Sequence, residues 1–412
     1  MLLCALGTLP AATSAASAAS PSAASVLRRM ARAQRGVNLR GRMVVVNLSG
    51  QQPRISTKRI VRSRSGRSLA VYLDPPAQRG TIMSDDGAWM CLFEPRRKTV
   101  SLKRSMPLGR ARKDIERQVR LIQHNYRVRV QGRENSAGRE CYRVMLEPRT
   151  PGRRSFQLWV DQATGVPLWR KESDARGNTL SLAMYTSVEY PARIPASEVL
   201  PAFPRDARRL NMSRSVVFGD VGRMRRATGF PVRLPLRMPS GHAFCAGTIV
   251  AVGGRPTAYL HYTDGMTDLT ICESRPPPER PAQWLEYSAT RTARDETVVY
   301  LGSDRLDVLV IGREEPRMLM AVAHQVDHGD EGPLLARLRR SYGASARALA
   351  SMRDRGLSVD SLAALLVIAR RSGKPFASLA ALCLQGWTWR DMATRFGLPP
   401  KAVERRVLSL RR

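Results

Sequence analysis

Apolar and polar residues alternate through most of the first half of the chain, and Gly, Asn, Asp and Pro divide the alternating runs. Such alternation is typical of half-buried strands, and the short breaks predict an antiparallel meander. Helical spacing at 24–35 predicts a helix over the open face of this sheet, and a mostly helical insertion is expected at 109–124. The predicted strands span residues 39–48, 55–64, 69–73, 81–84, 88–93, 99–102, 126–131, 140–146, 155–160, 166–173 and 179–189.

The second half of the chain divides into three parts. Residues 191–225 are rich in proline, arginine and short polar residues, which predicts a linker. Further strands are expected at 244–252, 255–262, 267–273, 296–301 and 305–311, followed by a helix at 316–326. From residue 333 the apolar spacing is helical throughout, and it predicts helices at 334–349, 359–371, 376–384, 388–396 and 401–410. The last two resemble a helix-turn-helix, with Ala393 at the crossing and Gly397 at the turn.

Two strand-and-turn motifs carry the most specific signal. The first reads LWVDQATGVPL at 158–168, and its Asp-x-x-Thr-Gly step predicts a turn with Gly165 at positive φ. The second reads YTDG at 262–265 and is followed by an apolar strand that ends in Glu273. ATGF at 227–230 precedes it and VLVIGREEP at 308–316 follows it.

In content and order, these landmarks resemble the RseB/MucB family of sigma-E regulators, whose half-barrel is shared with the lipoprotein carrier LolA. The resemblance covers 26–326 and implies an α+β fold: a half-open antiparallel β-barrel of the LolA type plus a smaller α/β domain. A C-terminal all-helical extension is not part of the family pattern. The expected divisions are a signal-peptide remnant at 1–24, a half-barrel at 25–190, a linker at 191–225, a small domain at 226–330 and a helical domain at 333–412.

The resemblance also implies a function. Proteins of this family are non-enzymatic; they bind the periplasmic segment of a membrane anti-sigma factor, shield it from proteolysis, and release it on sensing a lipid or lipopolysaccharide signal. The chain is therefore expected to be an exported binding regulator in the periplasm or cell envelope. Two alternatives stay open: a periplasmic lipid or lipoprotein carrier of the LolA type, and an intracellular DNA-binding protein that uses the C-terminal helices.

Length and charge set the context for these expectations. A chain of 412 residues with 43% hydrophobic residues is long enough for two or three cores. Its net charge of +34 would attract polyanions or an anionic membrane surface. However, only seven of the 68 basic residues are lysines, and a GC-rich coding sequence produces the same arginine excess. Peripheral membrane contact stays open, whereas export would exclude chromosomal DNA as the partner.

The first residues resemble the end of a secretory signal peptide. MLLCAL is followed by an Ala/Ser stretch with several Ala-x-Ala steps, although a positively charged segment is missing before it. A low-complexity tail is the alternative.

Cysteine usage argues against zinc and leaves disulfides open. After the leader the chain has five cysteines and no Cys-x-x-Cys pair. In an oxidising compartment Cys91 with Cys141, and Cys245 with Cys272, could each pair within a domain. The alternative is that all four are buried thiols that pack as small hydrophobes.

No motif of a known catalytic site is present. The chain lacks a Gly-x-Ser-x-Gly elbow, a P-loop, a His-Glu-x-x-His sequence and a dinucleotide glycine run, so we expect neither a catalytic residue nor a cofactor. His324 and His328 have helical i, i+4 spacing but fall at a helix end, so no metal site is predicted there. The acidic pair Glu314-Glu315 favours a helix start.

Binding chemistry is therefore expected in the half-barrel. An apolar concave face suits acyl chains, because each buried CH₂ is worth roughly 0.8 kcal/mol. The candidate lining residues are Met43, Val45, Trp89 and Leu92. Ordinary core packing is the alternative for each of them. The helical domain carries a net charge of +12 between residues 333 and 412, which would suit phosphate contacts.

Overall fold

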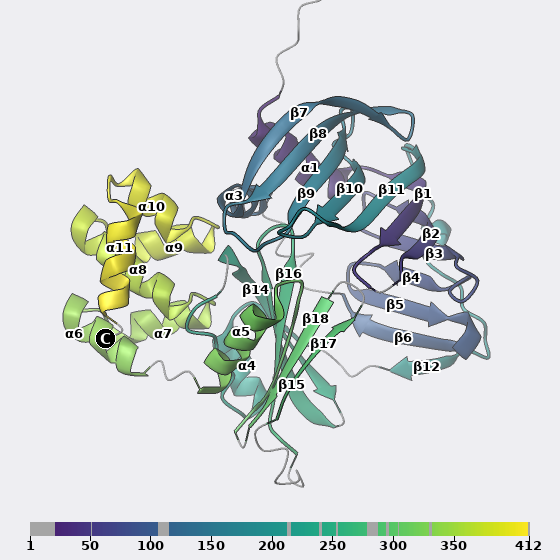
Figure 1. Cartoon of the computed structure of the whole chain (residues 1–412). Helices are drawn as coiled ribbons and strands as arrows, with labels where there is room; N and C mark the ends of the chain where they lie inside the picture. Colours follow the sequence, from purple (N-terminus) through teal and green to yellow (C-terminus); the bar gives the residue numbers. More distant parts are fainter. Residues whose placement is uncertain are drawn as a thin grey trace, which may run out of the picture.

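The computed structural model describes residues 21–50, 52–105, 115–211, 216–238, 241–252, 254–277, 287–293, 296–303, 305–328 and 332–410. Within these residues the chain forms a large sheet, a second sheet and a group of helices at its C-terminal end (Figure 1). The first 20 residues of the predicted leader lie outside the described part, and Ser22 already caps the first helix by accepting a hydrogen bond from Ser25 N.

The large sheet is open and almost wholly antiparallel. Its described strands run in the order β12-β6-β5-β4-β3-β2-β1-β11-β10-β9-β8-β7, and β12 alone pairs in parallel, with β6. Because β12 and β7 stand at opposite ends, the sheet does not close, which confirms the half-open barrel and the α+β class. The strands are β1 (Leu39–Asn47), β2 (Arg54–Arg62), β3 (Ser68–Asp74), β4 (Ile82–Asp85), β5 (Trp89–Glu94), β6 (Thr99–Arg104), β7 (Tyr126–Ser136), β8 (Arg139–Pro148), β9 (Ser155–Asp161), β10 (Pro167–Ser173), β11 (Thr179–Glu189) and β12 (Arg208–Asn211).

Two helices cover one face of this sheet. α1 (Ala23–Gly36) and α3 (Ile115–Asn125) present apolar stripes that pack on β7, β8 and β9. The shared core includes Leu27, Val119, Ile122, Val144 and Leu158, all nearly inaccessible to solvent. The first six residues of the predicted insertion, 109–114, lie outside the described part.

The segment predicted as a linker is built into both sheets. It crosses the face opposite α1, where Ile194 and Val199 cover Val61. The tilted ring of Phe203 packs on Phe93 there, with the ring centroids 5.6 Å apart. It then supplies β12 to the large sheet and β13 to the second sheet. Short 3-10 turns lie at Pro95–Arg97 and Ala196–Glu198.

The second sheet is antiparallel, in the order β13-β14-β15-β16-β19-β18-β17. Two helices, α4 (Val221–Thr228) and α5 (Pro316–His328), bury Met224, Leu319 and Val322 against it. β17 falls in a segment for which the sequence predicted no strand. The strands are β13 (Val216–Phe218), β14 (Ala243–Val252), β15 (Arg255–Thr263), β16 (Asp268–Ser274), β17 (Tyr287–Ala293), β18 (Glu296–Gly302) and β19 (Asp307–Gly312).

The C-terminal helices surround α8, which is apolar on nearly every side. The prediction of one helix at 334–349 is wrong, because Gly343 takes a φ of +64° and Ser345 caps a new helix. Ala393 is buried and Gly397 has a φ of +70°, as expected for the last two helices. No described helix is both long and apolar enough to cross a membrane. The helices are α6 (Gly332–Tyr342), α7 (Ala346–Asp354), α8 (Val359–Ser372), α9 (Phe376–Leu384), α10 (Trp389–Arg395) and α11 (Pro400–Ser409).

Candidate functional site

The turn between β15 and β16 meets the half-barrel in a buried polar cluster. Asp264 shapes this turn, because its Oδ1 accepts hydrogen bonds from the backbone N–H groups of Met266 and Thr267, each at 2.7 Å. Its Oδ2 accepts from the Tyr126 hydroxyl at 2.7 Å and from the Arg153 guanidinium. Tyr126 begins β7, and Arg153 lies in the loop between β8 and β9. One carboxylate therefore closes a local turn and joins two domains.

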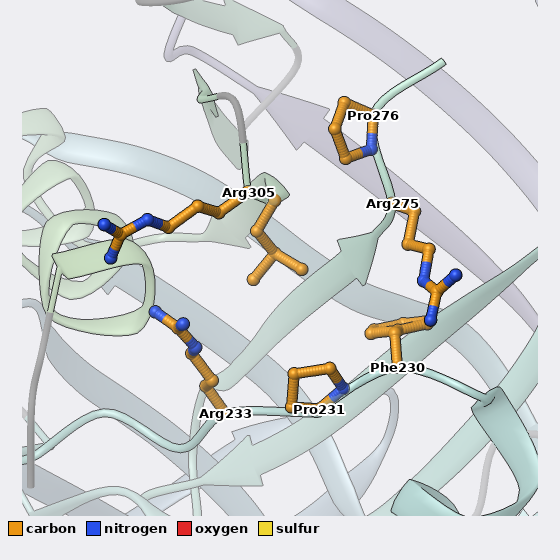
Figure 2. A pocket seen from close by; sticks show the side chains of 7 residues that line it. Phe230, Pro231, Arg233, Arg275, Pro276 and Arg305 are labelled. Carbon is orange, nitrogen blue, oxygen red and sulfur yellow. The ribbon is translucent and has the colours of Figure 1, made fainter. Parts of the chain in front are cut away.

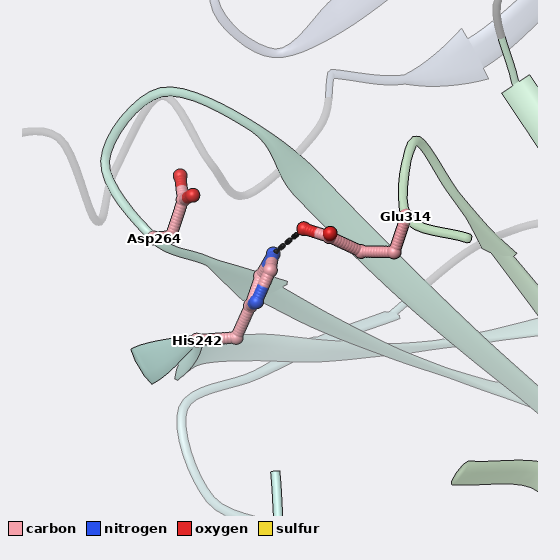
Figure 3. A group of neighbouring side chains, drawn as sticks. All are labelled: His242, Asp264 and Glu314. Carbon is pink, nitrogen blue, oxygen red and sulfur yellow. Dashed lines mark ion pairs between the residues drawn. The ribbon is translucent and has the colours of Figure 1, made fainter. Parts of the chain in front are cut away.

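Two further residues of the second domain complete the cluster. Figure 3 shows His242, Asp264 and Glu314 facing one another, with the His242 Nε2 atom 3.7 Å from Glu314 Oε1. Arg153 Nη2 lies 3.4 Å from the same Glu314 oxygen. The ligand atoms of the three residues lie within 4.8 Å of one another, a spacing that could suit a metal ion. Because the Arg153 guanidinium already faces both carboxylates, the arrangement favours an ion-pair cluster.

Burial governs the electrostatics of the cluster. Burial alone would raise the pKa of Asp264, but the charges of His242 and Arg153, together with hydrogen bonds to Thr267 and Tyr126, hold that pKa below its ordinary value. The pKa of the Tyr126 hydroxyl is raised, mainly by burial and then by the charge of Asp264. Arg153 is 1% exposed, so its charge is compensated by protein groups.

Backbone approach at the junction is close enough to require glycine. A Cβ atom at Gly265, whose φ is +98°, would lie 2.7 Å from Ile122 Cγ1 in α3. A Cβ at Gly241, with a φ of +71°, would lie 1.9 Å from Asn125 Oδ1. Asn125 also donates from Nδ2 to the Asp264 backbone oxygen at 3.0 Å. The end of α3 is therefore fitted to the second domain.

A second ionic contact joins the domains near β10. Glu172 is 1% exposed and faces three arginines: Arg154 at 2.5 Å, Arg313 at 2.9 Å and Arg170 at 3.3 Å. Arg313 comes from the second domain, between β19 and α5, whereas the other two belong to the half-barrel. Burial would raise the pKa of Glu172, but the surrounding arginines lower it.

The helical domain contacts both other domains. On the half-barrel side, Asp391 Oδ2 lies 3.4 Å from His124 Nδ1, and Arg120 donates to the Gln385 backbone oxygen at 2.8 Å. On the other side, Arg225 of α4 pairs with Asp354 at 2.8 Å. Asp391 also forms the capping box of α10, and its pKa is lowered to about 2 because hydrogen bonds from His124 and Thr388 outweigh the effect of burial. The helical domain therefore contacts the half-barrel through α3 and the second domain through α4.

The predicted ligand-lining residues do not all share one face. Residues that pair across neighbouring strands lie on the same face of the sheet. Strand by strand from β1 to β5, the paired residues are Gly41, Ile60, Ala70, Met83 and Leu92. Because side chains alternate along a strand, Leu92 shares this face with the predicted residues of β1. The face therefore contains Met43, Val45 and Leu92, whereas Trp89 points to the opposite one. All four side chains are partly exposed, and Met43 also packs near Ala33 of α1.

The structure does not bring either predicted cysteine pair together. Cys91, Cys141, Cys245 and Cys272 are free thiols. Cys91 lies on β5 and Cys141 on β8, at distant positions in the sheet order. Cys245 and Cys272 are separated by β15, which places their strands about 9.5 Å apart, beyond disulfide reach. Burial raises the pKa of Cys141 to about 11.

Comparison with known proteins identifies the N-terminal domain and the fold. Residues 22–203 match the MucB/RseB N-terminal domain family. This part of the chain therefore carries a MucB/RseB N-terminal domain. The structure of the chain resembles MucB in complex with MucA(peri), with 17% identity and a TM-score of 0.52, over 73% of this chain and 97% of that one. The MucA/MucB complex of Pseudomonas aeruginosa gives 18% identity and a TM-score of 0.51, over 73% and 96%. Comparison with curated proteins found no match.

Sequence reasoning found the turn at Asp264 but not the cluster around it. Glu314 had been interpreted as a helix-start carboxylate, and Arg153 and His242 carried no signal of their own. The only sequence signal at this site is the YTDG motif, in which Asp264 precedes a strand of alternating apolar residues. The histidine pair considered for a metal does not gain support: His324 is exposed on α5, and the side chain of His328 lies outside the described part.

Proposed function

We propose that the chain is an exported, non-enzymatic binding protein that holds the periplasmic segment of an anti-sigma membrane protein. The observation that carries this proposal is the likeness to MucB over nearly the whole of that protein, which was crystallised with MucA(peri). The match of residues 22–203 to the MucB/RseB N-terminal domain gives independent support from sequence.

The proposed mechanism works through the angle between the half-barrel and the second domain. The partner segment binds a surface that spans both domains, so its affinity depends on their relative orientation. A lipid-like ligand that favours a different orientation lowers this affinity, by as much as its own affinity differs between the two states. The cluster around Asp264 and the ion pairs of Glu172 set the free energy that such a reorientation must overcome.

The ligand is proposed to contact the sheet face that carries Met43, Val45 and Leu92. Met83 lies on the same face and is 38% exposed, so this face presents an apolar side chain to solvent. Methionine and aliphatic side chains adapt to an acyl chain without specific hydrogen bonds. The same surface would serve a lipid carrier of the LolA type, which is the second candidate function.

Crosslinking in cells tests the partner. The chain, expressed from its own locus, is crosslinked and recovered from envelope fractions, and the N-terminus of the recovered protein is sequenced. Recovery of a processed protein joined to a single-span membrane protein supports the proposal. Recovery of an unprocessed protein with DNA overturns the proposal and favours DNA binding through α10 and α11.

Lipid extraction distinguishes the regulator from the carrier. Purified protein is analysed by native mass spectrometry for retained acyl lipids. Met83→Glu should abolish retention, whereas the control Ile55→Glu should not, because Ile55 is exposed on the opposite face of β2. Lipid retention without recovery of any membrane protein partner favours the carrier. Equal retention by both variants would exclude this face as the lipid site.

A further inference from the structure

A cavity of about 270 Å³ opens on the second domain, away from the Asp264 cluster. It lies between the segment that follows α4, the end of β16 and the turn between β18 and β19. Three arginines line it, together with apolar residues, and the described lining contains no acidic side chain. The lining residues are Phe230, Pro231, Arg233, Arg275, Pro276, Arg305 and Leu306.

The three guanidinium groups reach the cavity from separate parts of the fold. Figure 2 shows Arg233 and Arg305 extending toward one end and Arg275 lying beside Phe230 at the other. Arg275 is held by donating to the Gly229 backbone oxygen, and Arg233 by donating to the Asp327 backbone oxygen. Within the described part of the chain, the Arg305 side chain has neither a hydrogen bond nor an ion pair and is exposed. It is therefore available to a ligand.

One carboxyl group beside the cavity, that of Glu273, contributes little negative charge to it. Glu273 is fully buried beside the cavity and accepts a hydrogen bond from the Arg233 backbone N–H at 2.8 Å. Burial raises the pKa of Glu273 to about 8, so the group is mostly uncharged at neutral pH. Glu273 therefore does little to offset the positive charge of the three arginines.

We propose that this cavity is a binding site for a phosphate monoester group. Guanidinium groups form paired hydrogen bonds with phosphate oxygens, and Arg233 and Arg305, which extend toward the same end of the cavity, can share a doubly charged group. The apolar wall formed by Phe230, Pro231, Pro276 and Leu306 suits the carbon part of a phosphorylated sugar or a phospholipid headgroup. The site is independent of the proposed anti-sigma partner, because it needs only this chain.

Calorimetry on the purified full chain tests the site, with glucose 6-phosphate as the soluble probe. Arg305→Glu should weaken binding about tenfold or more, because loss of one charge-assisted contact amounts to at least ~1.4 kcal/mol. The control is Arg317→Glu, which makes the same charge change at an exposed position of α5 outside the cavity. Thermal unfolding of both variants checks that they remain folded.

A second arm identifies the source of the phosphate group. Sedimentation is measured with phosphatidylcholine vesicles that either contain or lack phosphatidic acid. Arg305-dependent binding of the soluble ester supports a site for free phosphate esters, and Arg305-dependent binding of phosphatidic acid vesicles alone supports a headgroup site. Equal weakening by Arg305→Glu and Arg317→Glu, or the absence of binding in both arms, overturns the proposal.

Discussion

Asp161 and Asp264 occupy two turns that share one design and differ in what they hold together. Each carboxylate caps its turn through Oδ1, and each accepts a tyrosine and an arginine through Oδ2. For Asp161 these are Tyr190 and Arg139 of the same domain. For Asp264 they are Tyr126 and Arg153 of the other domain. The same local chemistry therefore closes a hairpin in one place and joins two domains in the other.

The two arginines also differ in their access to water. Arg139 is 34% exposed, whereas Arg153 is 1% exposed. An exposed guanidinium can recover its hydration when its partner is lost, but a buried one cannot. A single substitution should therefore lower the free energy of unfolding more at the interdomain turn of Asp264 than at the turn of Asp161.

Asp264→Asn should therefore give the largest loss. It leaves Arg153 buried with only Glu314 as an acidic neighbour, and loss of one member of a buried pair typically destabilises by about 3–5 kcal/mol. Asp161→Asn should cost about 1–2 kcal/mol, because Arg139 reaches solvent. Urea unfolding of the full chain measures both. Equal losses would show that joining the domains adds nothing to the energy of the turn.

Substitution of the buried Glu273 should have the opposite effect to that of Asp264, because it should stabilise the protein at high pH. The pKa of Glu273 is about 8 in the folded protein and lies near its ordinary value of 4.5 when unfolded. The contribution of neutral Glu273 to the free energy of unfolding is complete below pH 4.5 and is lost as the pH rises through 8. Glu273→Gln should therefore be more stable than the parent above pH 8, by a few kcal/mol. Unfolding curves between pH 5 and 9 test this, and parallel curves for the two proteins would contradict it.

Hydroxyl deletion offers a matched pair with smaller effects. Tyr126→Phe removes a fully buried hydrogen bond to Asp264 and should destabilise by about 1–3 kcal/mol. Tyr190→Phe removes a longer bond of 3.0 Å to Asp161 and should cost about 0.5–1 kcal/mol. Thermal unfolding compares them. A larger loss for Tyr190→Phe would reverse the ranking of the two turns.

The smallest effect is expected at the second interdomain contact. Arg313→Ala leaves Glu172 paired with Arg154 and Arg170, so the free energy of unfolding should fall by no more than about 1 kcal/mol. Limited proteolysis of the segment between β19 and α5 should nevertheless become faster, because this contact attaches that segment to the half-barrel. An unchanged rate of cleavage would show that the Arg313–Glu172 ion pair does not help to attach this segment to the half-barrel.

Local patterns predicted local structure well. The alternation that predicted strands 155–160 and 255–262 corresponds to β9 and β15, and the turn glycines Gly165 and Gly265 have positive φ. β12, β13 and β17 were missed because they are short or edge strands, whose pairing depends on a distant partner. The helix predicted at 334–349 is in fact interrupted at Gly343. The interruption was missed because a glycine within a periodic apolar pattern is only a weak signal for a helix end.

The candidate site was harder to predict for the same reason. Asp264 belonged to a recognisable motif, but Arg153 precedes it by more than a hundred residues and lies in a loop with two other arginines. A chain with 68 basic residues gives no indication of which one is buried. Only the fold brings that loop to the turn. The faces of Trp89 and Leu92 likewise required the strand register.

The path of residues 191–211 determines where this protein can be divided. A half-barrel fragment that ended at residue 190 would lose Ile194, Val199 and Phe203, and would expose the apolar side chains of Val61, Cys91 and Phe93 to water. It would also present β6 as a bare edge, which is a template for aggregation. A fragment that ended at residue 211 would keep both the apolar cover and β12. Cutting at the boundary suggested by composition would therefore remove both the apolar cover and the partner strand of β6.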